Sequence, residues 1–314
     1  MLLLYRGDNF DSNFFHHSGV DIDHSFFLED GRRRILLTSG MNEAIARRQF
    51  RGKVVVYSDA IKTLSKFIRR RTVSYDASSV SARLASRIGK ACRLKDCSQE
   101  LIIGRARKRP DEAAKMRRAV RLTKDIFDSL DLRGAKTELD VHAQLMRQTF
   151  GMGIEPAFEP IVATDANTSF PHYRAGKKRL GSLVLVDYGV RYGHYCADLT
   201  RCFILDNDRK KTEQYEKLQD ICWFLADSLP SLGTGKEVAK LAGDLVAKAG
   251  FPKMIHSIGH GVGLDVHEFP RLSEKFEDKL AGSVVALEPA FYLKRYGMRY
   301  EETVWTDGKR ARIL

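Results

Sequence analysis

The stretch LVLVDYGVRYGHYCADLTRCFIL, residues 183–205, decides how the second part of this 314-residue chain folds. It predicts two apolar strands, Ser182–Asp187 and Ala197–Leu205, joined through Tyr188–Cys196. Asp187 ends the first strand and Asp198 lies at the start of the second. A carboxylate among buried apolar residues is costly unless another charge neutralises it. If the two strands pair, both carboxylates converge on one point.

A second polar cluster is the segment HSIGHGVGLDVHEFP, residues 256–270, which carries three histidines among several glycines. A single histidine is easily accommodated in a core, but three within twelve positions indicate a site. The glycines predict a backbone that lets side chains approach a small ion or a substrate closely.

Glutamates on predicted strands form the third group. Glu288 follows the apolar run Ser283–Leu287, and the doublet Glu301–Glu302 lies within the predicted strand Met298–Trp305. Adjacent residues of a strand point to opposite faces, so only one of the doublet can join the other carboxylates. Parity alone does not choose between them, although the neighbours of each residue weakly favour Glu301.

Two aspartates, one histidine and two glutamates make a site for two divalent cations. Oxygen-rich ligand sets suit harder ions, which makes Mn²⁺ the first choice, with Co²⁺, Fe²⁺ or Zn²⁺ as alternatives. Two cations about 3.5–4 Å apart would share a hydroxide and polarise a carbonyl group. The expected chemistry is therefore metal-assisted hydrolysis.

The organisation around these clusters predicts two domains, residues 1–107 and 108–314. In the first third, alternating short apolar runs and helical patterns indicate a small α/β domain, and the second domain is expected to be α+β with antiparallel strands. The predicted strands of the first domain are Ile35–Thr38, Val54–Tyr57 and Leu101–Gly104, and its predicted helices are Ala60–Arg70 and Val80–Arg93. The predicted helices of the second domain begin at Pro110 and cover Thr137–Phe150, Thr212–Ser228 and Lys236–Ala249, and a last strand covers Ala311–Leu314.

Charge is unevenly distributed along the chain, whose formal net charge is +13. Residues 1–110 hold 22 Lys and Arg against 11 Asp and Glu, whereas residues 111–314 are nearly balanced. This excess would suit a nucleic acid or an acidic protein surface as partner. A solvated basic surface explains it better, because the basic runs lack interleaved aromatic residues. The five cysteines match no disulfide or metal pattern, and no apolar run is long enough for a membrane span. We therefore expect a cytoplasmic protein without membrane contact.

Taken together, the motifs resemble the metallopeptidases of the pita-bread fold, family M24. Within that family they are more similar to the Xaa-Pro peptidase branch, prolidase and aminopeptidase P, than to methionine aminopeptidase. The matching segments follow the family's order through the second domain: 167–173, 186–189, 197–201, 256–270, 287–292 and 297–301. The resemblance implies a pita-bread catalytic domain preceded by a smaller creatinase-like domain, and a homodimer.

The same resemblance implies roles for nine residues. Five would bind the two metal ions: Asp187, Asp198, His260, Glu288 and Glu301. His172 and His267 would hold the scissile carbonyl and stabilise the oxyanion. Glu288 would also relay a proton, and His256 and Arg299 would line the substrate pocket.

The leading hypothesis is therefore a dinuclear metallopeptidase that hydrolyses short peptides at Xaa-Pro bonds, as a dipeptidase or an aminopeptidase. An alternative from another class is a catalytically silent protein of the same fold that binds partners through its basic first domain. Loss of metal ligands would mark such a protein, and this chain lacks none of them. A third reading is methionine aminopeptidase, which shares the chemistry and differs in substrate.

Overall fold

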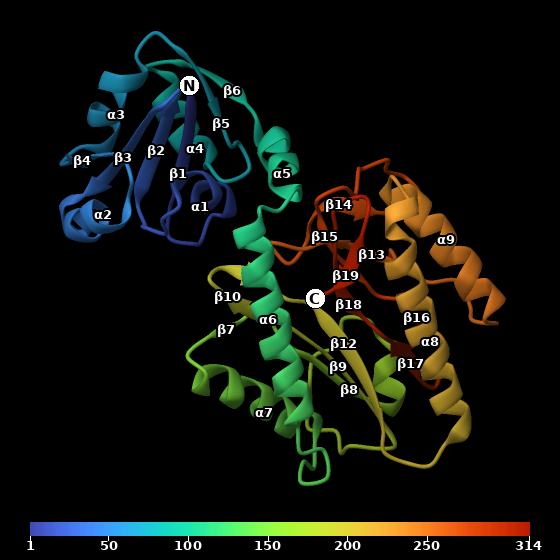
Figure 1. Cartoon of the computed structure of the whole chain (residues 1–314). Helices are drawn as coiled ribbons and strands as arrows, with labels where there is room; N and C mark the ends of the chain where they lie inside the picture. Colours follow the sequence, from blue (N-terminus) through green and yellow to red (C-terminus); the bar gives the residue numbers. More distant parts are fainter. The chain divides into compact units, whose positions relative to one another are not determined.

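The computed structural model describes residues 1–314, which divide into two compact units, Met1–Arg105 and Ala106–Leu314. Unit 1 is built on a six-stranded sheet in the order β4-β3-β2-β1-β5-β6 (Figure 1). Its strands are β1 (Leu2–Arg6), β2 (Ser25–Asp30), β3 (Arg33–Ser39), β4 (Lys53–Tyr57), β5 (Thr72–Tyr75) and β6 (Arg93–Asp96). Its helices are α1 (Ser12–Ser18), α2 (Glu43–Gln49), α3 (Ala60–Ile68), α4 (Ala82–Gly89) and α5 (Ser98–Ala106), with a short 3₁₀ turn at Gly40–Asn42.

Both faces of this sheet are buried, because side chains alternate along each strand. Leu3 and Leu4 are both fully buried, yet they belong to two different apolar clusters on opposite faces. The predicted α/β character of this region agrees with the observed elements. One element was predicted wrongly: Leu101–Gly104 is not a strand but part of α5. Strands β1, β2, β5 and β6 were not predicted.

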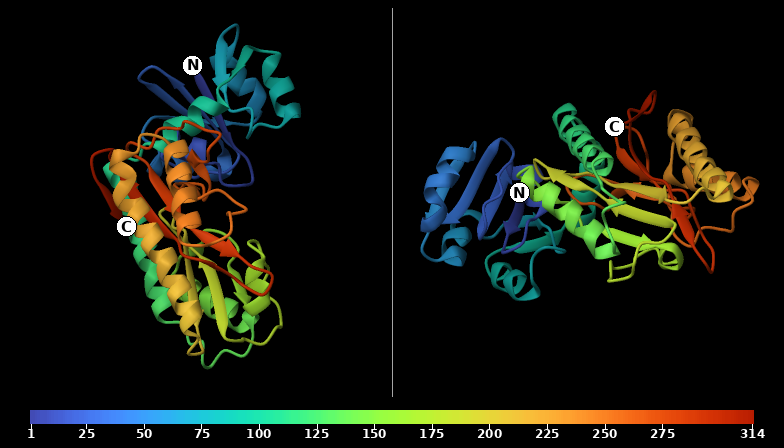
Figure 2. Two further views of the ribbon diagram at one scale, coloured as in Figure 1. Left: turned by 90° about the vertical axis from the view of Figure 1, so that its right-hand side faces the viewer. Right: turned by 90° about the horizontal axis from the view of Figure 1, so that it is seen from below.

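Unit 2 packs antiparallel sheets against four long helices (Figures 1 and 2). The helices are α6 (Pro110–Asp128), α7 (Glu138–Gly151), α8 (Arg209–Ser228) and α9 (Gly235–Lys248), with 3₁₀ turns at Asp165–Ser169 and Leu229–Ser231. The first strands are β7 (Glu155–Pro156), β8 (Ile161–Thr164), β9 (Leu183–Tyr188), β10 (Val190–Tyr192), β11 (Tyr195–Cys196) and β12 (Leu199–Ile204). The later strands are β13 (Gly259–Gly261), β14 (Glu268–Leu272), β15 (Val284–Leu287), β16 (Ala290–Tyr292), β17 (Gly297–Arg299), β18 (Glu302–Thr306) and β19 (Ala311–Ile313).

Two sheets of unit 2 carry the polar clusters. One has the order β12-β9-β8, and the other has the order β14-β13-β15-β18-β19. Every strand pair in unit 2 is antiparallel, as the sequence predicts for an α+β domain. The single predicted strand Met298–Trp305 is divided, because β17 pairs with β16 whereas β18 pairs with β15. No helix is long and apolar enough to span a membrane.

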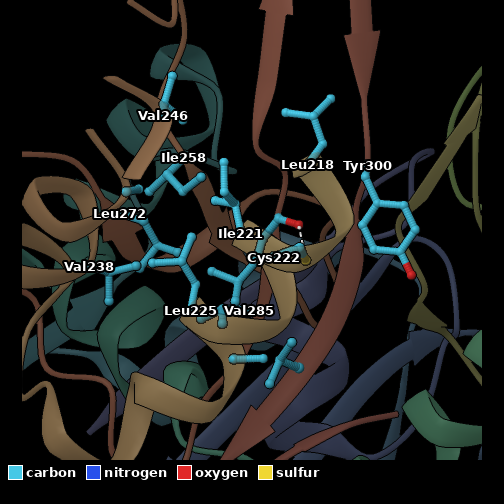
Figure 3. Close-up of a cluster of buried hydrophobic side chains, with 14 of the residues drawn as sticks. Leu218, Ile221, Cys222, Leu225, Val238, Val246, Ile258, Leu272, Val285 and Tyr300 are labelled. Carbon is cyan, nitrogen blue, oxygen red and sulfur yellow. Dashed lines mark hydrogen bonds between the residues drawn. The ribbon is translucent and has the colours of Figure 1, made fainter. Parts of the chain in front are cut away.

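Two apolar clusters hold these sheets in place. One lies between α6, α7 and strands β9 and β12, where Tyr188 is fully buried. The other joins α8 and α9 to strands β14, β15 and β18, and Figure 3 shows Leu225, Val238 and Val285 among its members. The five cysteines are unpaired, and four of them are buried. The helices thus cover the outer faces of the sheets and leave the polar residues on the inner faces.

Candidate metal centre and peptide site

The strand pairing brings the two aspartates together. In the β9–β12 ladder Asp187 lies directly opposite Thr200, and opposite residues share one face of an antiparallel pair. Asp198 lies two positions before Thr200 and therefore points to the same side. Gly189 makes the intervening turn possible, because a Cβ atom there would lie 1.8 Å from the carbonyl oxygen of Ala197.

The second sheet delivers the remaining groups to the same place. His260 on β13 lies opposite Ala286 of β15, and Glu288 follows the end of β15. Ligand atoms of Asp198, His260 and Glu301 all lie within 4.8 Å of one another. The Nε2 atom of His260 is 3.6 Å from Oδ2 of Asp198 and 3.9 Å from Oε1 of Glu288.

All nine residues singled out by the sequence line one cavity of about 630 Å³ in unit 2. They are His172, Asp187, Asp198, His256, His260, His267, Glu288, Arg299 and Glu301. The rings of His260 and His267 are 4.1 Å apart, centroid to centroid. Of the doublet, Glu301 enters the cavity, whereas Glu302 points to the opposite side and contacts Arg201.

Arg299 is the cation among these carboxylates, and it is only 3% exposed. Its Nη2 atom donates to Oδ2 of Asp187 at 2.6 Å and its Nε atom donates to Oγ1 of Thr200 at 3.0 Å. Its Nη1 atom donates to the hydroxyl of Tyr292 at 2.9 Å. The guanidinium therefore orients protein groups at the cavity wall.

Sequence reasoning missed two residues of this network, Thr200 and Tyr292. The Thr200 hydroxyl donates to Oε2 of Glu301 at 2.6 Å, and the Tyr292 hydroxyl lies 2.9 Å from Nε2 of His256. A signal was present for Thr200, since it shares the face of Asp198 two positions away. Tyr292 gave a weaker signal, because its contact with His256 depends on the β16–β17 pairing.

Negative charge is not balanced inside the cavity. Burial raises the pKa of Asp198 well above its ordinary value, and the charges of Glu301, Asp187 and Glu288 raise it further. Burial also raises the pKa of Glu301 well above its usual range, with Asp187 and Glu288 adding to the effect. Four carboxylates face a single guanidinium, so additional positive charge would stabilise this arrangement.

The donor set fits divalent cations on two further observations. The Nδ1 atom of His260 lies 3.1 Å from the carbonyl oxygen of Gly261, which assigns its proton there and leaves the Nε2 lone pair facing carboxylates. Burial lowers the pKa of His260 to about 3, so the imidazole is neutral and able to act as a ligand. The Oδ1 atom of Asp187 is buried without a hydrogen-bond partner. A cation would provide a partner for both the Nε2 atom of His260 and the Oδ1 atom of Asp187.

Comparison with known proteins agrees with this geometry. The model of metallopeptidase family M24 matches residues 114–307. An Xaa-Pro dipeptidase of Pyrococcus furiosus is 34% identical over 191 residues, which is 59% of this chain and 55% of that protein. This chain therefore spans about half the length of that relative.

Solved structures with the same fold extend over the whole chain. The X-Pro aminopeptidase of Thermotoga maritima is 25% identical, with a TM-score of 0.91 over 99% of this chain and 94% of that one. The prolidase of Pyrococcus furiosus is 24% identical and has a TM-score of 0.88 over 99% and 95% of the two chains. The fold is thus the α+β pita-bread fold expected from the sequence, and the chain belongs to metallopeptidase family M24.

Proposed function

We propose that this chain is a dinuclear, divalent-metal-dependent peptidase that hydrolyses short peptides at Xaa-Pro bonds. The observation that carries the proposal is the surplus of buried carboxylates around one neutral imidazole, with a single arginine among them. The names of the dipeptidase relative and of the solved aminopeptidase support the choice of Xaa-Pro substrates. In this proposal residues 108–314 form the catalytic domain.

The metal ions would be held by Asp187, Asp198, His260, Glu288 and Glu301. Bound divalent cations supply Lewis acidity toward a peptide carbonyl and activate the attacking water. Arg299 keeps Asp187 oriented, since the two side chains are in contact at 2.6 Å. Thr200 orients Glu301 in the same way, because its hydroxyl group donates a hydrogen bond to that carboxylate.

The remaining residues act on the peptide. His172 and His267 line the cavity beside the carboxylates and would donate hydrogen bonds to the carbonyl oxygen as negative charge develops on it. Glu288 would accept the proton of the attacking water and deliver it to the leaving nitrogen. His256 would contact the substrate, with its ring held by the Tyr292 hydroxyl and by the carbonyl oxygen of Ser257.

A peptide panel tests this proposal directly. Purified protein supplied with Mn²⁺, and in parallel with Co²⁺, Fe²⁺ or Zn²⁺, is incubated with an Xaa-Pro dipeptide, an Xaa-Pro-Yaa tripeptide and Met-Ala. We expect release of the residue before proline, and the ratio of the first two rates separates dipeptidase from aminopeptidase specificity. Release of methionine alone would identify a methionine aminopeptidase. No hydrolysis with any of the four metals would refute the proposal.

Manganese as the preferred metal, a homodimer and a cytoplasmic location belong to the same proposal. Elemental analysis of protein purified without added metal tests the first. Sedimentation equilibrium tests the second, and fractionation of the source cells tests the third.

A further inference from the structure

A buried ion pair lies behind the cavity and has no part in the chemistry proposed above. The Nζ atom of Lys108 is 2.6 Å from Oε1 of Glu268, and the two side chains are only 2% and 1% exposed. Lys108 also donates from Nζ to the carbonyl oxygen of Ala106 at 3.1 Å and from its backbone to Gly282 at 2.8 Å. The segment that precedes α6 is thereby joined to the first residue of β14.

Glu268 is the direct neighbour of His267. His267 lies in the bend just before β14 and lines the cavity, whereas Glu268, the first residue of β14, is buried in the protein. Holding the Glu268 carboxylate in place therefore also holds the piece of backbone that carries the His267 side chain. The register of β13 and β14 shifts between His260 and Gly261, so strand pairing alone holds this point less tightly than the rest of the sheet.

Gly263 supplies an independent observation. A Cβ atom at this position would lie 1.8 Å from Oε1 of Glu268 and 2.9 Å from Cε of Lys108. The sequence suggested that this glycine allows an ion or a substrate to approach closely. The structure instead shows that a side chain here would collide with the ion pair. Gly261 likewise faces backbone, with a Cβ atom only 2.1 Å from the carbonyl oxygen of Phe269.

We infer that Lys108 is a positioning residue for His267 and acts on it through Glu268. Two buried charges gain little stability over well-packed apolar side chains of the same size, so the ion pair is better explained by the orientation that it imposes. The inference rests on the proposed function, because it assigns Lys108 to the histidine that would stabilise the oxyanion. It gives the segment between α5 and α6 a part in building the site.

Three variants test the inference. Lys108→Met removes one charge, and the double variant Lys108→Met with Glu268→Met removes both while keeping their volume. Arg271→Met is the matched control, since Arg271 lies on the same strand and pairs with Asp278 at 2.8 Å with its side chain 42% exposed. For each variant we measure kcat and KM on an Xaa-Pro dipeptide, metal content, Tm, and the side-chain signals of ¹⁵N-labelled histidines.

We expect Lys108→Met to lower kcat at least about tenfold with little change in KM or metal content. The double variant should have a Tm close to that of the wild type, but its kcat should stay as low as that of Lys108→Met. Arg271→Met should resemble the wild type in both quantities. The ring signals of His267 should move in both Lys108 variants, while those of His24 in unit 1 serve as an internal reference. If kcat recovers together with Tm, or if the His267 signals stay in place, the inference is wrong. An inactive wild type would refute the proposed function alone, because the histidine signals still report on the ion pair.

Exposed cations are concentrated at one end of the sheet in unit 1. Strands β1, β3, β4, β5 and β6 run in one direction, so their starts share one end of the sheet with the end of β2. Nine exposed cations gather there from four separate segments: Arg32, Arg33, Arg51, Lys53, Arg69, Arg70, Arg71, Lys90 and Arg93. We call this surface the basic end. Its acidic neighbours are Glu29 and Asp30, and Asp30 accepts from Arg71 at 2.6 Å.

Acidic residues gather at the opposite end of the same strands. Asp8 and Asp59 follow the ends of β1 and β4, Asp96 is the last residue of β6, and Asp23 precedes β2. The excess charge of unit 1 is therefore concentrated on one end rather than spread over its surface. Six strands at roughly 4.8 Å spacing give the basic end a width of about 24 Å, which is broad enough to cover the phosphates on one side of a duplex.

We propose that the basic end binds the phosphate backbone of a nucleic-acid duplex without sequence preference. The segments that form it contain no aromatic side chain, so they offer no platform for stacking unpaired bases. Contact through phosphate groups alone needs only clustered cations. The sequence favours a solvated basic surface because it shows only separate short basic runs, whereas the fold gathers these runs into one cluster.

Fluorescence anisotropy with a labelled duplex and the full chain tests this second proposal. Binding should be measurable at about 50 mM salt and should weaken steeply as salt rises. Charge reversal at Arg32 and Arg33 should weaken binding and reduce the salt slope by about 2, whereas reversal at Lys210 and Lys217 on α8 should change neither. Absence of binding at low salt, equal losses in both variants, or preference for a poly-glutamate competitor over the duplex would each overturn the proposal.

Discussion

Glu301 and Glu302 are neighbours in the chain, are both almost fully buried, and face opposite environments. Glu301 lies among other carboxylates and accepts a hydrogen bond from the Thr200 hydroxyl group. Glu302 contacts Arg201, accepts from Tyr300 at 2.8 Å and lies 3.1 Å from Nζ of Lys124. A buried carboxylate with cations of its own is neutralised within the structure, whereas one that lacks them indicates a site for an ion from outside.

The largest effect is expected for replacement of Glu301. Replacing it by Gln removes a charged ligand, and losing several kcal/mol of charge stabilisation in the transition state should lower kcat/KM at least about a thousandfold. Asp198→Ala should abolish turnover for the same reason. Steady-state kinetics with elemental analysis measure both effects, and wild-type activity in either variant would contradict the assignment of these residues as ligands.

Glu302→Gln tests the other side of the strand. It leaves Arg201 and Lys124 without their carboxylate partner, which should reduce the free energy of unfolding by about 3 kcal/mol. Turnover by the molecules that remain folded should change much less than in Glu301→Gln. Urea unfolding measures the stability and steady-state kinetics measure the turnover. A stable but inactive Glu302→Gln protein would contradict the proposed difference between Glu301 and Glu302.

A smaller effect is expected for Thr200→Val, which keeps the shape of the side chain and removes its hydroxyl group. Glu301 and Arg299 then lose the group that connects them, so kcat should fall by roughly tenfold with metal content largely retained. Thr212→Val provides a control, because that exposed hydroxyl contacts only the carbonyl oxygen of Asp208. Equal kinetics for the two variants would show that Thr200 does not orient the ligand.

The smallest effect concerns stability without metal. In metal-free protein Asp198→Asn removes part of the mutual repulsion of the carboxylates and should raise Tm slightly above that of the metal-free wild type. Added Mn²⁺ should reverse the order, since a ligand at about 100 times its Kd stabilises the wild type by about 2.7 kcal/mol. Differential scanning calorimetry with and without a chelator gives all four values. A lower Tm for metal-free Asp198→Asn would show that the carboxylates do not repel one another.

Much of the site could be predicted because each ligand lies beside a recognisable apolar strand. The alternation along β9 and β12 placed Asp187 and Asp198 together, and the parity of the doublet left a choice that only the sheet could make. Leu101–Gly104 was misread because a short apolar run is compatible with either a strand or a buried helix. Lys108 could not be anticipated, since its partner lies 160 positions away.

The turn between the two aspartates places a limit on how this protein can change. Its tip, Gly193 and His194, has positive φ at both residues, 54° and 72°, which is the geometry of a tight two-residue hairpin. Beyond it, side chains of β12 alternate inward and outward opposite β9. A residue inserted within β11 would shift its register against β10 and exchange the two faces of that strand, whereas extra residues at the tip would only lengthen the loop. Length variation among active descendants of this sequence should therefore be confined to the tip.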